Sequence, residues 1–209
     1  PINFEKEGLG DMICDVVGMT CGPADSVGSR AWKNFAKKSH NGKEKVNIAV
    51  IGKYFNTGDF TLSDSYLSVI EAIKYSAYAV NRKPVLTWLS SLDFGKDPKK
   101  VKELSKYDGI IVPGGFGARG VEGKIKVIEY ARTHNIPYFG LCYGMQLMVI
   151  EYARNVLGFK DANTREINPS SKHLVIDIME DQKEKIATKK LGGSMRLGAY
   201  EARLKKGSV

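Results

Sequence analysis

The chain has 209 residues, of which 43% are hydrophobic and 26% charged, and its formal net charge is +9. It contains no run of 18 apolar residues, which argues against a membrane-spanning segment and a membrane partner. The lysines occur as scattered pairs, without a nucleic-acid-binding motif or interleaved aromatic residues. We therefore expect a solvated basic surface and no nucleic-acid partner, although anionic small molecules such as nucleotides remain compatible with the charge.

The three cysteines, Cys14, Cys21 and Cys142, are an odd number, and none of them has the CxxC spacing of a metal site. We therefore expect no metal centre in this chain. A reduced, cytoplasmic compartment is the simplest interpretation of this cysteine usage.

Residues 1–44 differ in pattern from the remainder of the chain. They contain two cysteines, a break at Gly22-Pro23 and a polar stretch over residues 37–43. We interpret them as an incoming linker with one or two short helices, the better candidate lying over residues 29–37. A chain that starts at Pro1 is expected to be a segment of something longer.

From residue 46 onward, apolar strands alternate with segments of helical periodicity. The expected strands are residues 46–51, 85–89, 109–112 and 138–141, and the expected helices are residues 65–80, 98–104, 121–134 and 145–156. Ser63 or Asp64 is a plausible N-cap of the first helix, and Pro98 suits the first turn of the second. Two further strands, at 173–178 and 195–204, are expected to form an antiparallel excursion at one edge.

This alternation, with short connections, predicts an α/β fold. The expected architecture is flavodoxin-like: a mostly parallel sheet with helices on both faces.

Residues 138–146 read Tyr-Phe-Gly-Leu-Cys-Tyr-Gly-Met-Gln. An apolar strand that runs through Gly140-Leu141-Cys142-Tyr143-Gly144 into a helix is typical of a nucleophile elbow, with cysteine in the place of serine. The sharp turn needs glycine on both sides because the strained central residue leaves no room for neighbouring Cβ atoms. It places the thiol at the N-terminus of a helix, where a negative charge is stabilised. We therefore predict that Cys142 is a catalytic nucleophile.

A glycine-rich loop, residues 113–120, follows the strand at 109–112 and reads Pro-Gly-Gly-Phe-Gly-Ala-Arg-Gly. One helix separates this strand from the strand before Cys142, so a right-handed crossover brings both loops to the same edge of the sheet. Acyl transfer needs two backbone donors aimed where an oxyanion will form. We expect the N–H groups of Gly115 and Tyr143 to supply them.

With these two motifs the chain resembles class I (triad-type) glutamine amidotransferases, and more narrowly the glutaminase domains of CTP synthases. The narrower resemblance is carried by VIGKY at 50–54, SDSY at 63–66, SVIEA at 68–72, VPGGFGARGVEG at 112–123, DAN at 161–163 with Glu166, and GGSMRLG at 192–198. The resemblance covers nearly the whole chain. It implies that residues 1–44 are the end of a synthase domain and an interdomain linker. Residues 45–209 would then be a glutamine amidotransferase domain whose C-terminal part is missing.

The resemblance also implies a function and a set of partners. The domain would hydrolyse L-glutamine through a Cys thioester and supply ammonia for the ATP-dependent amination of UTP to CTP. ATP and Mg²⁺ would act in the N-terminal synthase domain of the same polypeptide, GTP would be an allosteric activator, and the full-length protein would be a homotetramer.

The resemblance implies roles for particular residues of this chain. These are the nucleophile Cys142, the oxyanion-hole residues Gly115 and Tyr143, the glutamine-binding residues Gly115, Tyr143, Gly144, Met145, Gln146 and Glu166, and the GTP or coupling residues Phe116, Arg119, Glu122 and Arg196.

A cysteine nucleophile of this class needs a histidine base that a carboxylate orients, and the family carries both in a late His-Pro-Glu string. This chain contains no His-Pro-Glu. His40 lies in the polar linker, His134 at a helix end and His173 at the start of an expected strand, so we expect structural roles for all three. The family's late arginine for the substrate carboxylate is absent too. We therefore expect a fragment of a longer protein that turns glutamine over poorly.

Two alternatives stay open. The first is a non-catalytic module that keeps the elbow but senses glutamine or a nucleotide, and the absent base is its only support. The second is another cysteine hydrolase or amidotransferase on the same scaffold. The strings at 116–122 and 192–198 argue against that second alternative, because generic relatives need neither.

Overall fold

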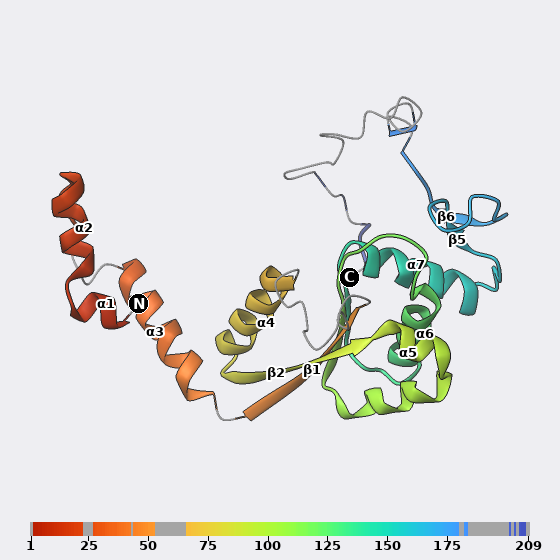
Figure 1. Ribbon diagram of the computed structural model, residues 1–209, viewed down its shortest axis with the longest axis horizontal. Coiled ribbons are helices and arrows are strands. Elements are labelled where there is room, and N and C mark those ends of the chain that lie inside the picture. Colours follow the sequence, from red (N-terminus) through yellow and green to blue (C-terminus); the bar gives the residue numbers. More distant parts are fainter. Residues whose placement is uncertain are drawn as a thin grey trace.

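The computed structural model describes residues 2–22, 27–42, 44–52, 66–179, 182–183, 201, 203 and 205–207. These residues form an α/β body from which a helical arm extends (Figure 1). Several sequence predictions fall outside the described residues: the N-cap at Ser63 or Asp64, the 192–198 string with Arg196, and most of the strand expected over 195–204.

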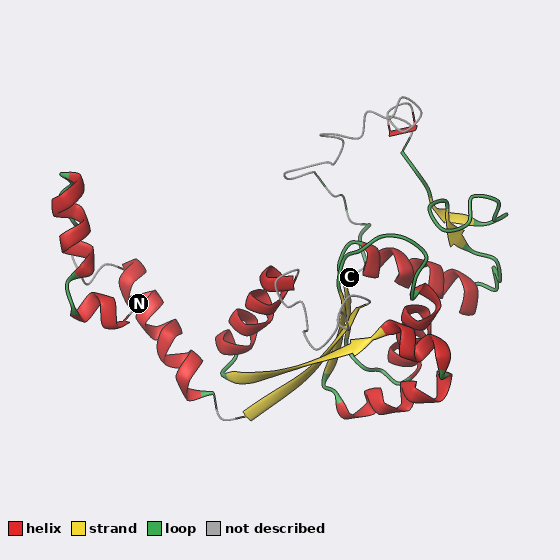
Figure 2. Cartoon of the chain, viewed as in Figure 1, coloured by secondary structure: helices red, strands yellow, loops and turns green. Residues whose placement is uncertain are grey.

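Four parallel strands form the sheet of the body (Figure 2). In spatial order they are β2 (Arg82–Ser90), β1 (Glu44–Gly52), β3 (Gly109–Val112) and β4 (Tyr138–Gly140). The strands predicted over residues 46–51, 85–89, 109–112 and 138–141 are all confirmed. After β2 the chain passes β1 to form β3, so the strand order reverses between β1 and β3. In open α/β sheets, ligands bind outside the carboxyl ends of the strands near such a reversal.

The strands bury alternate side chains in two separate cores, as the period of two in a strand requires. On one face, Ala49 and Ile51 of β1 are fully buried in a cluster with Phe94, Leu104, Ile110, Val112, Val127 and Ala131. On the opposite face, Val50 is fully buried and packs near Ile48, Val69, Ile73 and Trp88. The apolar run of β1 therefore reflects burial on both faces.

Helices cover both faces of the sheet, as predicted. On the Val50 face lies α4 (Leu67–Ala79), and on the other lie α5 (Ser91–Lys96), η2 (Pro98–Lys106), α6 (Val121–Thr133) and α7 (Tyr143–Asn155). The segment from Pro98 forms a 3₁₀-helix, with the Asp97 side chain accepting a hydrogen bond from the Lys99 N–H. The sequence did not predict α5, a six-residue helix that contains Gly95.

The α4 face of the sheet is covered unevenly. A groove of about 580 Å³ runs beside α4, and its sheet side includes Ile111, Phe139 and Leu141. Phe139 of β4 is 61% exposed. In the described part of the chain, this face of β3 and β4 therefore has no helix packed over it.

A second, two-stranded sheet consists of β5 (Asn163–Thr164) and β6 (Leu174–Ile176). The strand expected over residues 173–178 is present as β6, but it runs parallel to β5, a strand that the sequence did not predict. The other strand expected for an antiparallel excursion, over 195–204, lies mostly outside the described residues. The connection returns to the start of β5 before β6 begins: the Ser171 hydroxyl donates to the Asp161 carbonyl at 2.6 Å, and the Lys172 N–H donates to the Asp161 carboxylate at 2.9 Å. The chain therefore enters β6 in the same direction as β5.

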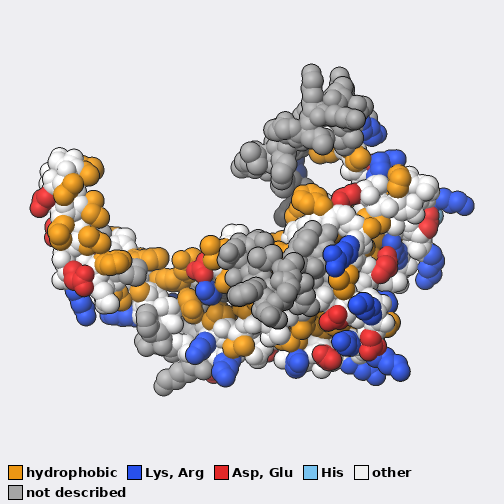
Figure 3. Space-filling view, viewed as in Figure 1, with side chains coloured by type: hydrophobic (Ala, Val, Ile, Leu, Met, Phe, Trp, Pro, Cys, Tyr) orange, Lys and Arg blue, Asp and Glu red, His pale blue; other side chains and the backbone are white. Residues whose placement is uncertain are grey.

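The arm consists of α1 (Ile2–Lys6), α2 (Leu9–Val17) and α3 (Val27–Asn41), whereas the sequence predicted one or two helices. The end of α3 packs on α4, where the ring centroids of Phe35 and Tyr75 are 5.4 Å apart and the Lys38 ammonium donates to the Ala79 carbonyl. Farther out, apolar side chains cover much of the visible surface of the arm (Figure 3). The exposed large apolar side chains of this part of the arm are Phe4, Met12, Ile13, Val16, Val17 and Met19, each more than half exposed.

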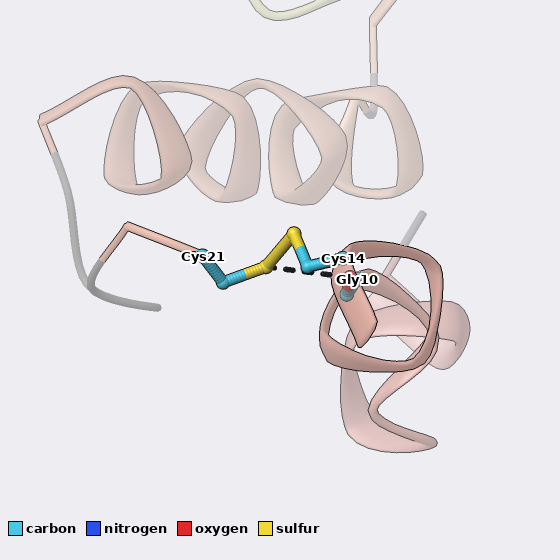
Figure 4. Close-up of a disulfide and its surroundings, with 3 residues drawn as sticks. All are labelled: Gly10, Cys14 and Cys21. Atoms are coloured by element: carbon cyan, nitrogen blue, oxygen red, sulfur yellow. Dashed lines mark hydrogen bonds between the residues drawn. A yellow bond between two sulfur atoms is a disulfide. The ribbon is translucent and has the colours of Figure 1, made fainter. Parts of the chain in front are cut away.

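Two of the three cysteines are bonded to each other, which corrects the expectation of reduced thiols. Cys14 on α2 forms a disulfide with Cys21, and their Cα atoms are 5.8 Å apart (Figure 4). The reason is local: α2 ends at Gly18, whose φ of 68° turns the chain back, and the Met19 N–H donates to the Cys14 carbonyl. This turn brings Cys21 back alongside α2.

Among the described residues, no helix is long and apolar enough to cross a membrane.

A buried ion pair joins α6 to α7. Glu151 of α7 is fully buried, and its carboxylate accepts hydrogen bonds from Nε and Nη2 of Arg132 on α6 and from Nδ2 of Asn155. Removing one partner of such a pair leaves an uncompensated buried charge.

We therefore expect Arg132→Met to lower the free energy of unfolding by about 2 kcal/mol, less than for a fully buried pair because Arg132 keeps part of its surface in water. Urea unfolding measures this change. The matched control is Arg82→Met, which removes an exposed pair with Glu44 and should change stability by less than about 0.5 kcal/mol. Equal effects of the two substitutions would contradict the role given to the Arg132–Glu151 pair.

The contact between α7 and β3 depends on a glycine. A Cβ atom at Gly144 would lie 2.1 Å from the Val112 carbonyl oxygen, so α7 can approach β3 only with no side chain at this position. We expect Gly144→Ala to lower the free energy of unfolding by about 3 kcal/mol, because helix and strand must separate. At Gly114 the added Cβ would be 3.6 Å from the nearest atom, so Gly114→Ala should change it by less than about 1 kcal/mol. A Gly144→Ala chain as stable as Gly114→Ala would show that this close approach is not needed.

Candidate active site

Cys142 lies at the junction of β4 and α7, at the carboxyl edge of the sheet. Its backbone has φ 50° and ψ −102°, a conformation that non-glycine residues rarely adopt. Its side chain is exposed and not bonded to another cysteine. Strained backbone at a strand-to-helix turn is the geometry that presents a nucleophile above the sheet.

The glycine on the strand side of the turn is sterically required. A Cβ atom at Gly140 would lie 2.5 Å from both the Gly144 carbonyl carbon and the Met145 nitrogen. Such contacts are too short for any side chain, so the first turn of α7 folds directly over Gly140. Together with the Gly144 contact to β3, this confirms the steric reason for which the sequence places glycine on both sides of the elbow.

The structure brings the glycine-rich loop against the elbow. A Cβ built on Gly114 would be in contact with the Cβ of Cys142, at 3.6 Å, and one built on Gly115 would be 3.9 Å from Cδ1 of Tyr143. The Leu141 N–H donates to the Val112 carbonyl at 2.9 Å, which joins the ends of β3 and β4. Within the described residues, the N–H groups of Gly115 and Tyr143 have no hydrogen-bond partner. They are therefore available to an acceptor near the thiol.

Gly117 connects this loop to two of the sequence-predicted residues. Its N–H donates to Oε1 of Glu166 at 2.6 Å, and its carbonyl accepts from the Tyr143 hydroxyl at 2.8 Å. Burial, reinforced by the nearby Glu166 carboxylate, raises the pKa of Tyr143 to about 12. The hydroxyl therefore stays protonated, and remains a donor, at any ordinary pH.

The other predicted glutamine-binding residues lie in the first turn of α7. The Gln146 N–H donates to the Cys142 carbonyl at 3.1 Å, and the Gln146 side chain is half-buried. Met145 is 48% exposed, and Gly144 is buried against β3. Gly115, Tyr143, Glu166 and Gln146 thus come from three separate segments that meet at the elbow and the glycine-rich loop.

The predicted GTP and coupling residues are only partly placed. Phe116 is 67% exposed on the loop, and Arg119 is exposed near its end. Glu122 lies in the first turn of α6 and accepts hydrogen bonds from Nη1 of Arg154, at 3.0 and 3.2 Å. Arg196 lies outside the described residues.

Neither histidine whose side chain the structure describes is near Cys142. His134 ends α6, its ring stacks on Tyr130, and it lies at the opposite end of β4 from the elbow. His173 stacks on Phe159 and pairs with Asp161, beyond the far end of α7, a helix about 20 Å long. This pairing holds the pKa of Asp161 at about 2. Both histidines have the structural roles that we expected.

Three features of the site were missed from the sequence. The Tyr143 hydroxyl contacts a residue 26 positions away, Arg154 pairs with Glu122 across 32 positions, and Lys124 is almost completely buried with its ammonium 5.4 Å from the Tyr143 ring centroid. The only sequence signal for the Tyr143–Gly117 contact was a tyrosine next to the cysteine. No sequence signal marked the Arg154–Glu122 pair or the burial of Lys124. In the part of the chain that is described, no three His, Cys, Asp or Glu side chains are grouped to hold a metal ion.

Known proteins are similar to this chain in sequence and in fold. Residues 61–208 match the family model described as glutamine amidotransferase class-I. The chain is 45% identical over 208 residues to a CTP synthase of Carboxydothermus hydrogenoformans and 43% identical over 209 residues to one of Sulfolobus acidocaldarius. Each alignment covers 100% of this chain but only 37% of the relative, so the chain spans little more than a third of the length of these proteins.

A solved structure is similar as well. It is the Trypanosoma brucei CTPS glutaminase domain with bound acivicin, which is 40% identical, with a TM-score of 0.61 over 68% of this chain and 53% of that one. Relatives that are named as enzymes do not favour a purely sensing module. The family match over residues 61–208, the parallel sheet and the cysteine elbow agree, and the chain belongs to the class-I glutamine amidotransferases.

Proposed function

We propose that this chain is the glutamine-hydrolysing part of a longer enzyme that converts UTP to CTP. The observation that carries the proposal is the exposed Cys142 thiol on a strained turn, with Gly114 and Gly115 packed against the same turn. A thiol, two backbone N–H groups without a hydrogen-bond partner among the described residues, and a nearby carboxylate are among the groups that hydrolysis of an amino-acid amide requires.

The proposed reaction has two acyl-transfer steps. The Cys142 sulfur attacks the side-chain amide carbon of glutamine, and the oxyanion that forms accepts hydrogen bonds from the N–H groups of Gly115 and Tyr143. The C–N bond then breaks, the nitrogen takes a proton and leaves as ammonia, and a glutamyl thioester remains. Water adds to the thioester, the C–S bond breaks, and glutamate leaves while the sulfur regains its proton.

The general base of this reaction is proposed to come from outside the described residues. Of the histidines whose side chains are described, His134 precedes β4 at the end of the strand away from Cys142. His173 lies beyond the C-terminal end of α7, whereas Cys142 lies at the N-terminal end of that helix. A chain without that base should form the covalent bond at Cys142 far more readily than it releases glutamate.

Glu166 and Gln146 are proposed to hold the amino-acid end of glutamine, with Gly144 and Met145 lining the same end. Oε1 of Glu166 is bonded to Gly117, and within the described residues Oε2 has no hydrogen-bond partner. Glu166 is exposed, so Oε2 is free to accept from the substrate's α-ammonium group in a charge-assisted hydrogen bond.

The remainder of the reaction is assigned to a synthase domain of the same polypeptide. The chain spans 37% of its relatives' length, and the exposed apolar side chains of α1 and α2 form a surface that a neighbouring domain would bury. We propose that residues 1–44 are the end of that domain and the linker from it. ATP and Mg²⁺ would act there, in a cytoplasmic homotetramer.

GTP is proposed to activate the glutaminase reaction through the loop that follows β3. Phe116 offers an exposed ring and Arg119 an exposed cation on the loop beside the elbow. Glu122 would act with them at the start of α6, where its pairing with Arg154 ties the loop to α7. Arg196 completes the proposed set from outside the described residues.

The proposed nucleophile can be tested on this chain. A chloromethyl ketone analogue of glutamine should alkylate Cys142, the thiolate displacing chloride, and intact-mass spectrometry would count the adducts. Glutamine at ten times its Kd should slow labelling about tenfold by occupying the site. D-Glutamine is the control ligand, and Cys142→Ala should not be labelled. Labelling that L-glutamine does not slow would contradict the proposal.

The proposed role in CTP formation needs the full-length protein. We expect Cys142→Ala to abolish glutamine-dependent CTP formation and to leave ammonia-dependent formation within about twofold, because only ammonia supply uses the thiol. Absorbance of the product during turnover reports both rates. Equal loss of both activities would show that Cys142 serves the fold or the synthase reaction instead.

A further inference from the structure

Gly117 is held through both of its backbone polar groups by residues from two other segments. Its N–H is bonded to the Glu166 carboxylate at 2.6 Å and its carbonyl to the Tyr143 hydroxyl at 2.8 Å. Its φ of 75° is in the left-handed region, so this peptide follows a sharp turn of the loop.

The Tyr143 ring is itself firmly placed. It is 1% exposed, it packs with Val121, Ile125 and Leu147, and the Lys124 ammonium lies 5.4 Å from its centroid. A hydroxyl on a ring held in this way is a fixed donor. The hydrogen bond it makes therefore sets the position of the Gly117 carbonyl, and not the reverse.

Only Phe116 separates Gly117 from Gly115, whose N–H is a proposed oxyanion donor. A shift of the Gly117 peptide therefore reorients the Gly115 N–H, and a hydrogen bond weakens steeply when its angle departs from linear. Glu166 can also anchor Gly117, but its carboxylate is exposed and is assigned to the substrate ammonium. Tyr143 supplies the anchor that does not depend on the substrate.

We propose that the Tyr143 hydroxyl positions the oxyanion hole: it fixes Gly117 so that the Gly115 N–H stays aimed at the position above the Cys142 thiol. This inference rests on the proposed glutaminase function. Tyr143 then acts twice, with its own backbone N–H as one donor and with its side chain as the anchor of the other.

The test compares two tyrosine hydroxyls of the same elbow. Tyr143→Phe removes the bond to Gly117, whereas Tyr138→Phe removes a similar bond of 2.9 Å to the Gly144 carbonyl, which lies in α7 and not in the loop. Both variants of the 209-residue chain are treated at pH 9 with two probes. The chloromethyl ketone analogue of glutamine carries a ketone oxygen that the two N–H groups can polarise as the thiolate displaces chloride, whereas iodoacetamide alkylates the thiolate without being held in the glutamine site.

We expect Tyr143→Phe to lower the maximal labelling rate with the ketone about tenfold, with less than a twofold change in its half-saturating concentration. Labelling with iodoacetamide should be unchanged, and Tyr138→Phe should match the unaltered chain with both probes. Hydrogen exchange should become faster over residues 113–120 in Tyr143→Phe alone, which detects loss of the anchor independently of any chemistry.

Ketone labelling of Tyr143→Phe at the rate of the unaltered chain would overturn the inference. An equal fall with iodoacetamide would overturn it as well, since the effect would then be on the thiol. If the unaltered chain itself shows no saturable ketone labelling, the proposed glutaminase function fails and the inference fails with it. The unaltered chain alone gives this result, so it is distinguished from a failure of the Tyr143 inference, which appears only in the variants.

Discussion

The site depends on one backbone constraint, the positive φ of Cys142. A cysteine holds this conformation only if the surrounding structure compensates for a strain of about 1–3 kcal/mol. Two close approaches provide the frame: α7 folds over Gly140, and Gly144 lies against the Val112 carbonyl. The same contacts bring the end of β3, and with it the glycine-rich loop, beside the thiol. Strain, helix placement and the shape of the site are thus consequences of one turn.

The loop after β3 is the second part of the site, and its contacts connect the nucleophile to Glu166 and to α7. Its glycines lie against Cys142 and Tyr143, and its middle is bonded to Glu166 and to the Tyr143 hydroxyl. Its end leads into α6, where Glu122 pairs with Arg154 of α7. A ligand that contacts the exposed Phe116 or Arg119 would therefore act on a segment already tied to the nucleophile, to the substrate carboxylate and to α7.

The sequence predicted the features that depend on neighbouring residues, such as the strands of the larger sheet and the elbow. The apolar runs located the four strands of the larger sheet. The glycine spacing around Cys142 identified the elbow, because a turn with no room for Cβ atoms requires glycine at fixed positions of the sequence. The helix α5 was missed because its six residues make fewer than two helical turns, too few for a periodic pattern to show. The parallel direction of β6 depends on the hydrogen bonds of Ser171 and Lys172 to Asp161, which no periodicity reports. The arrangement of the site residues followed from the order of the strands, whereas the Tyr143–Gly117 contact required the folded chain.

The oxyanion hole above Cys142 can be observed in a crystal structure of this chain alkylated by the chloromethyl ketone analogue. We expect one adduct, on Cys142, with the ketone oxygen within hydrogen-bond distance of the N–H groups of both Gly115 and Tyr143. We also expect the ammonium group of the adduct to contact Glu166. An adduct on Cys142 whose oxygen points to solvent, away from both N–H groups, would contradict the proposed oxyanion hole.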